Sequence, residues 1–263
     1  MKCPTKHLET ESFVFDCTST ISSQAILKIF EEKGFVVLRN LFSSNLIDDI
    51  RSKIDSRLQT PSVAGSAGYS VIDYPRKMLT PSTIVEGKIV DILVDNRITT
   101  IIESFMQSEC VLAETGIKFD KGRVGYEYFP MHCDYWDGWS LDGKFTITKE
   151  ELSFPVAVGK ILYLHDTVDG CFCYLEGSHK FTTHKGDLLK NYSKEEIETL
   201  SATKVPILGK KGDVILFDSR GFHGPDQPSN SDRLAIISRF YRIKSFGHVQ
   251  ASPIPLWTSD IAR

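Results

Sequence analysis

The sequence predicts a mainly β fold, a sandwich or barrel with helices packed against its outside. From Cys110 onward the chain breaks into six or seven short β-rich runs separated by Gly, Pro and Asp, and the part before Cys110 shows helical apolar spacing. This order of elements is typical of such architectures. The 263 residues, 41% of them hydrophobic, suffice to bury a core without disulfides or a structural metal. Because no internal repeat or linker divides the chain, we expect residues 1–263 to form a single domain.

The part of the chain before Cys110 is expected to be rich in helix. Residues 1–20 show no periodicity and are interpreted as a loosely held lead-in. The elements predicted after them are a helix from Ser22 to Gly34, a strand over 35–40, a helix over 43–58, a long Ser-, Gly- and Pro-rich loop over 61–81, and one or two helices ending near Ser108. Helical apolar spacing, with serine before and glycine after a helix, supports the helices, and β-branched apolar residues support the strand.

The strand-rich part spans residues 110–245 and is expected to form the β core. Its predicted strands are CVLAETGIKF, RVGYEYFPMHC, AVGKILYLHD, CFCYLEGSH, TKVPIL, DVILFD and LAIISRFYRI. One insert, around 186–201, returns to helical spacing and is predicted to interrupt the strands.

Charge and cysteine content narrow the class of protein. The 31 Lys and Arg against 34 Asp and Glu give a net charge of −3, without the basic stripe that tracks nucleic acid. No apolar run approaches the length that spans a bilayer, and the N-terminus lacks the apolar stretch of a signal peptide. The 6 cysteines include no CxxC pair. We therefore expect a cytoplasmic protein with free thiols and neither a nucleic-acid nor a membrane partner.

The strongest local signal is His132 and Asp134, at the end of the strand-like run GYEYFPMHCD. Successive side chains of a strand point to opposite faces, so His132 and Asp134 would share one face while Cys133 points away. An imidazole and a carboxylate would then converge on one point. A solvated surface pair is the alternative interpretation of so short a pattern.

His223 is the third candidate ligand, immediately after the strand-like run DVILFD and before a Gly-Pro turn. Two histidines and one carboxylate on one side of a metal, with the other positions open, form the facial triad of non-haem Fe(II) oxygenases. A zinc hydrolase could use the same three ligands, although no separate base for a metal-bound water is evident. The sequence thus favours a metal site at His132, Asp134 and His223.

Arg233 follows His223 by ten residues, at the start of the apolar strand LAIISRFY. A guanidinium there could hold a carboxylate bidentately in a partly buried pocket, such as the far end of a dicarboxylate cosubstrate bound to the metal. The alternative is a surface ion pair with Asp232 or another acid.

Over most of its length the chain resembles the phytanoyl-CoA dioxygenase-like family of Fe(II)- and 2-oxoglutarate-dependent oxygenases. The segments that carry the resemblance are GFVVLRNLFS, HCD at 132–134, HDTVDGCFCYLEGSHK at 165–180 and GDVILFDSRGFHGPDQPSNSDRLA. The Gly-Ser-His turn together with the spaced triad and Arg233 is more specific than any one of these segments. The resemblance implies a double-stranded β-helix, that is, a cupin-like jelly roll with helices buttressing one sheet.

Position by position, the resemblance makes His132, Asp134 and His223 the iron ligands and Arg233 the partner of the 2-oxoglutarate C5 carboxylate. Lys77 stands where the family often adds a second basic residue, with Arg76 beside it as an alternative. The chain departs from the family at Asp169-Gly170, where Asn-Gly is usual, and at Pro225, where a small hydroxyl residue is usual. These departures concern the finer cosubstrate contacts and leave the metal ligands in place.

The resemblance further implies Fe(II) as cofactor, 2-oxoglutarate and O2 as cosubstrates, and hydroxylation of an unactivated C–H bond with release of succinate and CO2. Related iron halogenases have Ala or Gly at the carboxylate position, so Asp134 disfavours halogenation. Desaturation, ring closure and epimerisation remain alternatives within the class. His165, His179 and His184 are interpreted as structural, His179 as part of a turn.

Tyr135, Trp136 and Trp139 follow the first two candidate ligands directly. We predict that these aromatic residues wall or cover a substrate pocket, with packing against the outer helices as the alternative. The loop over 61–75, with Tyr69 and Tyr74, is a weaker candidate lid.

Two other classes of protein remain open at this point. One is a non-catalytic jelly-roll binding protein without metal, and the other is a cupin-type isomerase or hydrolase that uses another divalent metal. The expected partner is a small-molecule substrate, such as a biosynthetic intermediate, because no basic cluster suited to the phosphates of coenzyme A is evident. The sequence does not indicate an oligomeric state.

Overall fold

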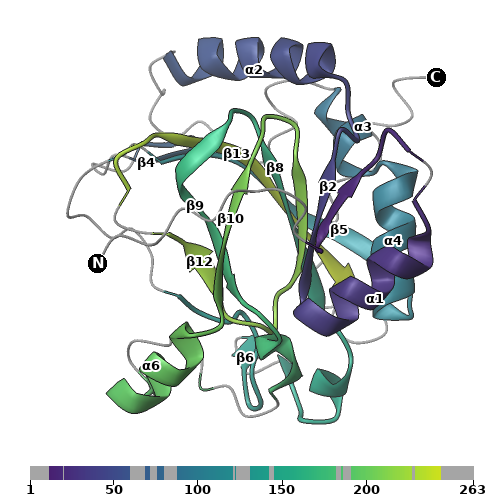
Figure 1. Ribbon diagram of the computed structural model, residues 1–263, viewed down its shortest axis with the longest axis vertical. Coiled ribbons are helices and arrows are strands. Elements are labelled where there is room, and N and C mark those ends of the chain that lie inside the picture. The colour runs from purple at the N-terminus through teal and green to yellow at the C-terminus, as the bar shows by residue number, and fades with distance from the viewer. Residues whose placement is uncertain are drawn as a thin grey trace.

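The computed structural model describes residues 12–19, 21–59, 69–71, 76–79, 88–120, 122, 131–141, 145–181, 185, 191–226 and 229–243. Most of the described strands fall into two sheets that face each other, with most of the helices packed against the larger sheet (Figure 1). This is the predicted mainly β architecture with flanking helices.

The larger sheet has eight strands in the order β1-β2-β11-β8-β13-β5-β4-β3. Their bounds are β1 Val14–Asp16, β2 Phe35–Arg39, β3 Tyr69–Val71, β4 Arg76–Leu79, β5 Cys110–Asp120, β8 Ala157–Tyr163, β11 Val214–Asp218 and β13 Arg233–Arg242. The smaller sheet has the order β10-β9-β12, with β9 Thr167–Leu175, β10 Lys204–Gly209 and β12 His223–Pro225. A short hairpin joins β6 Ser140–Leu141 to β7 Phe145–Thr146.

The helices come mostly from the first part of the chain. They are α1 Ser23–Lys33, α2 Ser44–Gln59, α3 Ile89–Leu93, α4 Asn96–Met106 and α6 Lys194–Ser201, with short 3-10 turns η2 Glu151–Ser153 and η3 Ser178–Lys180. Among the described residues, no helix combines the length and the apolar character needed to cross a membrane. Helix α1 ends at Gly34, as predicted, with a φ of 85° and its N–H donating to the Phe30 carbonyl.

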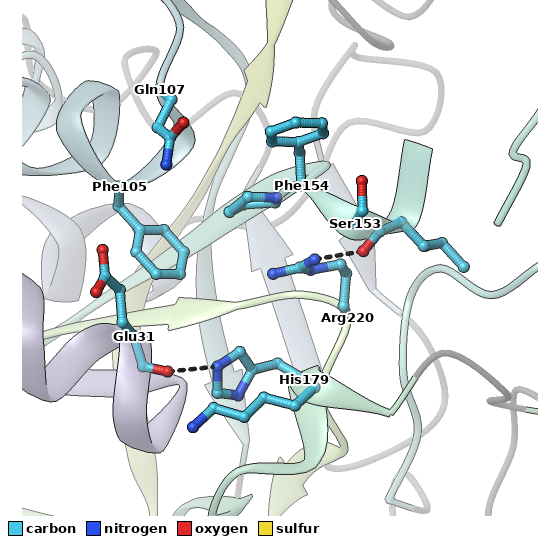
Figure 2. A pocket seen from close by; sticks show the side chains of 10 residues that line it. Glu31, Phe105, Gln107, Ser153, Phe154, His179 and Arg220 are labelled. Atoms are coloured by element: carbon cyan, nitrogen blue, oxygen red, sulfur yellow. Dashed lines mark hydrogen bonds between the residues drawn. The ribbon is translucent and has the colours of Figure 1, made fainter. Parts of the chain in front are cut away.

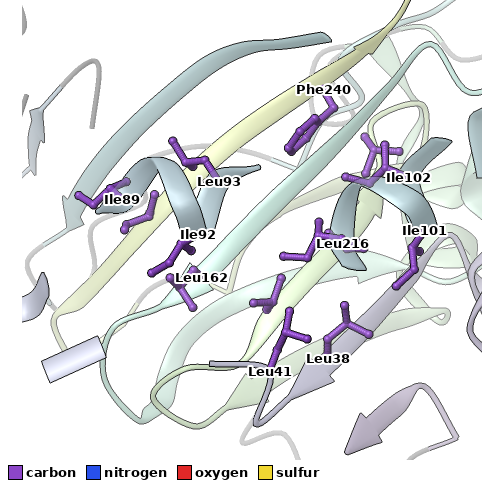
Figure 3. Close-up of a cluster of buried hydrophobic side chains, with 14 of the residues drawn as sticks. Leu38, Leu41, Ile89, Ile92, Leu93, Ile101, Ile102, Leu162, Leu216 and Phe240 are labelled. Atoms are coloured by element: carbon purple, nitrogen blue, oxygen red, sulfur yellow. The ribbon is translucent and has the colours of Figure 1, made fainter. Parts of the chain in front are cut away.

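The largest hydrophobic cluster lies between the helices and the outer face of the larger sheet (Figure 3). Side chains of α3 and α4, such as Ile92 and Ile102, meet sheet residues such as Leu162 and Leu216, all fully buried. Lys160 also points to this side, where its ammonium donates to the carbonyls of Ile92 and Leu93 at the end of α3. Burial lowers the pKa of Lys160 to about 7.

A second cluster, here called the interior cluster, fills the space between the two sheets. Its members are Phe13, Phe35, Val37, Ile161, Tyr163, Phe172, Tyr174, Ile207, Ile215, Phe217 and Ala235. Because strand residues alternate between faces, β13 presents Leu234 and Ile236 to the helices and Arg233, Ala235 and Arg239 to the interior. The candidate site lies at this interior face.

The structure corrects several local predictions. The segment 61–81 is not one long loop, since β3 and β4 within it pair with each other and β4 pairs with β5. Strand β1 lies within the predicted lead-in and pairs with β2 in parallel, and strands before Cys110 contribute to the larger sheet. The predicted insert is helical over Lys194–Ser201, while Leu188 and Leu189 lie outside the described residues. Long-range pairing, which local patterns do not report, accounts for these differences.

Candidate metal centre

The backbone brings His132 and His223 side by side although they are far apart in the sequence. The two residues form an isolated antiparallel bridge, in which each N–H donates to the other's carbonyl at 3.0 Å and 2.8 Å. The Asp134 N–H donates to the Ser219 carbonyl at 3.0 Å. The predicted strand before His132 falls largely at 123–130, outside the described residues.

The side chains of the three predicted ligands converge. Asp134 Oδ1 lies 3.6 Å from His132 Nε2, and its Oδ2 lies 3.6 Å from His223 Nε2. The two imidazole centroids are 4.5 Å apart. One ligand atom from each of the three residues falls within 4.8 Å of the others, so one ion could be held by all three.

The orientation of His223 is fixed by a hydrogen bond of Nδ1, the ring nitrogen that does not approach Asp134. Its Nδ1 lies 2.9 Å from the Gly221 carbonyl, and a carbonyl can only accept, so Nδ1 carries the proton. The lone pair is therefore on Nε2, the atom nearest Asp134. This arrangement is typical of a histidine that ligates a metal.

Asp134 carries a buried oxygen that has no hydrogen bond in the described part of the chain. Its Oδ2 is that atom, and Arg239 Nη2 approaches it at 3.1 Å as an ion pair without the geometry of a hydrogen bond. Burying a carboxylate oxygen without a hydrogen bond costs free energy of folding. A carboxylate that lies beside two imidazoles and has one oxygen without a hydrogen bond fits a cation ligand.

The electrostatics favour the protonation states that a metal requires. Burial opposes the ionisation of Asp134, but the charge of Arg239 and the neighbouring imidazoles outweigh it and hold the pKa of this carboxyl below its usual range. Burial lowers the pKa of His223 to about 4. At neutral pH the site therefore presents a carboxylate and a neutral imidazole.

The lowered pKa of His223 predicts a pH-dependent stability of the metal-free protein. In the folded state His223 stays neutral down to about pH 4, whereas in the unfolded chain it takes up a proton below about pH 6.5. The free energy of unfolding should thus fall by roughly 3 kcal/mol as the pH is lowered through this window. Urea unfolding at several pH values, with a chelator present, measures this slope.

The variant His223→Gln should flatten this pH dependence. The pH slope of the free energy of unfolding is compared with that of His179→Gln. Burial also lowers the pKa of His179, but this residue lies outside the triad. An equal slope in wild type and His223→Gln would contradict the assignment.

The predicted Gly-Ser-His turn supports His223 from behind. Ser178 Oγ accepts a hydrogen bond from the Phe222 N–H at 2.8 Å. A Cβ at Gly221 would lie 1.9 Å from the Tyr174 hydroxyl and 2.8 Å from Ser178 Oγ, so this position has room only for glycine. His179 is structural, as predicted, but it ties the turn to α1 through its Nε2, 3.1 Å from the Glu31 carbonyl.

The structure pairs Arg233 with a buried acid rather than with a surface one. Arg233 Nη2 lies 2.5 Å from Asp120 Oδ2 on β5, and Nη1 donates to the Gly170 carbonyl at 3.3 Å. Asp120 is thus a neighbour that sequence analysis did not name. Lys77 lies on β4, opposite Phe119 of β5, and its side chain lies outside the described part of the chain.

The three predicted substrate aromatics occupy different environments. Tyr135 is buried in a small cluster with Val156 and Tyr241, and Trp139 packs against that cluster with its ring 5.3 Å from the Tyr135 ring. Trp136 packs instead against the cluster of Cys133, Leu175 and Phe222. Their role toward a substrate stays a prediction.

Arg239 is the residue of the site that sequence analysis missed. Besides Asp134 it approaches Glu114, whose carboxylate accepts from the Tyr241 hydroxyl at 2.6 Å. A signal was available, because Arg239 is six residues after Arg233 on one strand and therefore shares its face.

A separate cavity of about 380 Å³ lies between α1, α4 and the segment before β8 (Figure 2). Its lining includes Glu31, Phe105, His179 and Arg220, and none of the triad residues. The Arg220 guanidinium is held by Asp218 and the Leu152 carbonyl. This cavity is distinct from the candidate metal centre.

Comparisons with known proteins identify the family and the fold. An ectoine dioxygenase of Stutzerimonas stutzeri (strain A1501) is 22% identical over 219 residues, which cover 76% of this chain and 70% of the relative. The crystal structure of EctD from S. alaskensis with bound Fe aligns with a TM-score of 0.67 at 17% identity, covering 86% of this chain and 78% of that chain.

HygX from Streptomyces hygroscopicus, with nickel, 2-oxoglutarate and hygromycin B bound, aligns with a TM-score of 0.60 at 19% identity, covering 82% of this chain and 86% of that chain. These likenesses confirm the predicted jelly-roll fold. The family model of phytanoyl-CoA dioxygenase (PhyH) matches residues 30–235. The chain therefore belongs to the phytanoyl-CoA dioxygenase family and is an Fe(II)- and 2-oxoglutarate-dependent dioxygenase.

Proposed function

We propose that this enzyme hydroxylates an unactivated C–H bond of a small molecule and releases succinate and CO2. The observation that carries the proposal is the convergence of His132, Asp134 and His223, whose ligand atoms lie within 4.8 Å of one another. The buried Asp134 oxygen without a hydrogen bond supports a cation at this point.

The donor set suits the metal that the family uses. Two imidazole nitrogens and one carboxylate form the facial triad of non-haem iron enzymes and leave the remaining positions open. His132, Asp134 and His223 would hold Fe(II), and the iron with its 2-oxoglutarate would supply the activation of O2. The Gly221 carbonyl would keep His223 Nε2 directed at the ion.

Arg233 would bind the distal carboxylate of 2-oxoglutarate. His223 pairs with Tyr174 of β9, and Arg233 donates to Gly170, four residues along the same strand. This is a backbone separation of roughly 13 Å. A five-carbon dicarboxylate and an arginine side chain together could bridge it, with Asp120 fixing the orientation of the guanidinium. Lys77 would be a second contact.

A small-molecule substrate is supported by the similar proteins, since one is an ectoine dioxygenase and HygX was crystallised with hygromycin B bound. Tyr135, Trp136 and Trp139, close to Asp134 in the chain, would wall the substrate side. A cytoplasmic location remains part of the proposal.

An assay of succinate formation tests the proposed function. Purified protein is given Fe(II), 2-oxoglutarate and air, first alone and then with a panel of small amines, amino acids and biosynthetic intermediates. We expect slow succinate release that depends on Fe(II), with acceleration and a mass gain of one oxygen for the true substrate. Absence of cosubstrate consumption throughout the panel would favour a binding protein or another metal chemistry.

A substitution of Arg239 allows metal binding to be measured as a change in thermal stability. In Arg239→Met the partly buried Asp134 carboxylate loses its neighbouring cation, which should destabilise the metal-free protein by up to about 3 kcal/mol. A bound divalent ion would replace the lost charge. We therefore expect Mn(II) to raise the Tm of Arg239→Met more than that of wild type.

Arg39→Met is the matched control for this measurement. Arg39, the last residue of β2, forms an ion pair at 2.9 Å with the buried Asp213, which directly precedes β11. Its loss should destabilise the protein without increasing the effect of Mn(II). Equal Mn(II) shifts in Arg239→Met and wild type would contradict the metal assignment at Asp134.

A further inference from the structure

The outer face of the smaller sheet carries a second cluster of metal-ligating side chains, unrelated to the triad. Cys171 and Cys173 lie on β9 and alternate with Phe172 and Tyr174, which belong to the interior cluster. Both thiols therefore point to the same, outer face. They are 1% and 0% exposed and form no disulfide.

A charged pair lies beside the two thiols. The N–H of Asp226 donates to the Cys171 carbonyl at 2.7 Å, which fixes this residue next to β9. Asp226 Oδ1 lies 2.6 Å from Lys204 Nζ on β10. Because β9 is the middle strand of the sheet, this ion pair reaches across the cysteine-bearing strand.

We propose that Cys171, Cys173 and Asp226 form a second metal site, for a thiophilic divalent cation of the zinc class. The two sulfurs and one carboxylate oxygen already lie within 4.8 Å of one another. Ligand atoms of a tetrahedral zinc site are roughly 3.5 to 3.8 Å apart, given metal–ligand distances of about 2.0 to 2.3 Å. Side-chain adjustments of about one ångström would close the site, with water in the fourth position.

In the loaded cluster, the negative charges of the three ligands equal the positive charges of the divalent ion and Lys204. A hydrogen bond with Cys171, together with burial, raises the pKa of Cys173 well above its ordinary value. In the metal-free cluster a protonated Cys173 therefore lies beside the ion pair of Asp226 and Lys204. In the loaded cluster, two thiolates and one carboxylate face a divalent ion and Lys204. Binding releases the Cys173 proton and leaves no net charge among these groups.

Such an ion would join the two strands that support the iron site. Strand β9 supplies the Gly170 carbonyl that accepts from Arg233, and Asp226 directly follows β12, which begins at His223. A cation here would stiffen that pair of strands from outside the barrel. Buried cysteines often serve only as small hydrophobic core residues. If that were the role of Cys171 and Cys173, no cation would bind.

Cobalt(II) tests the site, because thiolate ligands give cobalt a near-ultraviolet charge-transfer band that imidazole and carboxylate ligands do not give. Metal-free protein, kept reduced with a phosphine under argon, is first loaded with one equivalent of Mn(II), which prefers oxygen and nitrogen ligands. Added Co(II) should then produce the thiolate band at one ion per chain, and Zn(II) should remove it.

Variants assign the band to its ligands. Cys171→Ser/Cys173→Ser should abolish it, Asp226→Asn should weaken it, and His132→Ala/His223→Ala should retain it. Cys110→Ser is the matched control and should retain the band. Cys110 also has a carboxylate neighbour, Glu103, whose Oε1 lies 3.8 Å from its Sγ. No thiolate band in wild type, or a band that survives the double cysteine variant or disappears with the double histidine variant, would overturn the proposal.

Discussion

Replacing His223 with alanine is expected to abolish succinate formation and to weaken binding of Fe(II) or Mn(II) at the triad by at least about 100-fold. The variant removes one of the three proposed ligands, the imidazole whose Nε2 is directed at Asp134 by the hydrogen bond of Nδ1 to the Gly221 carbonyl. Calorimetric titration with Mn(II), performed under argon, measures the affinity, and the succinate assay measures turnover.

The control for His223→Ala is His179→Gln. His179 is also buried and also bonded to a backbone carbonyl, but it contacts α1 rather than the triad. It should lower the Tm while retaining Mn(II) binding. Metal affinity of His223→Ala within a few-fold of wild type, in a folded protein, would show that the triad does not hold the ion.

Removal of the Arg233 guanidinium is expected to raise the KM for 2-oxoglutarate by about 100-fold, with a smaller change in kcat. Arg233→Met alone would leave the Asp120 carboxylate buried without its cation, at a cost of about 3–5 kcal/mol in stability. The double variant Arg233→Met/Asp120→Asn avoids this cost and isolates the effect on the cosubstrate. Steady-state kinetics at varied 2-oxoglutarate gives KM and kcat.

Two further variants separate a structural ion pair from a cosubstrate contact. Asp120→Asn alone leaves Arg233 in place, so its KM should stay close to that of wild type or fall. Arg39→Met/Asp213→Asn removes a comparable buried ion pair elsewhere in the larger sheet and should leave the KM unchanged. A KM of the Arg233→Met/Asp120→Asn variant equal to that of wild type would assign Arg233 to the fold alone.

The order of helices and strands could largely be read from local patterns. Gly34 was predicted to end α1, and its φ of 85° explains why glycine stands there. Helices α2, α3 and α4 before Cys110 and the strand-rich part after it also agree with apolar spacing. Strands β3 and β4 were missed, because each is short and gains its stability from pairing, β4 with β5 and β3 with β4, rather than from its own sequence.

The candidate site was only partly predictable. His132 and Asp134 could be proposed together, since two residues apart in an extended segment share a face. Arg239 was missed although it shares a strand face with Arg233, and Asp120 could not be proposed, because its neighbour Arg233 comes from another strand. The same holds for Asp226 beside Cys171 and Cys173, where residues from two strands meet across the sheet.

The sequence by itself determined the ligand types, the approximate strands that carry them and the family resemblance. The tertiary structure alone decided that Asp134 faces Arg239, that Arg233 pairs with Asp120, and that a pair of thiols meets a carboxylate outside the barrel. The physical reason is register. A shift of one residue between paired strands turns every side chain to the opposite face, and the register follows from the packing of the whole sheet rather than from any one strand.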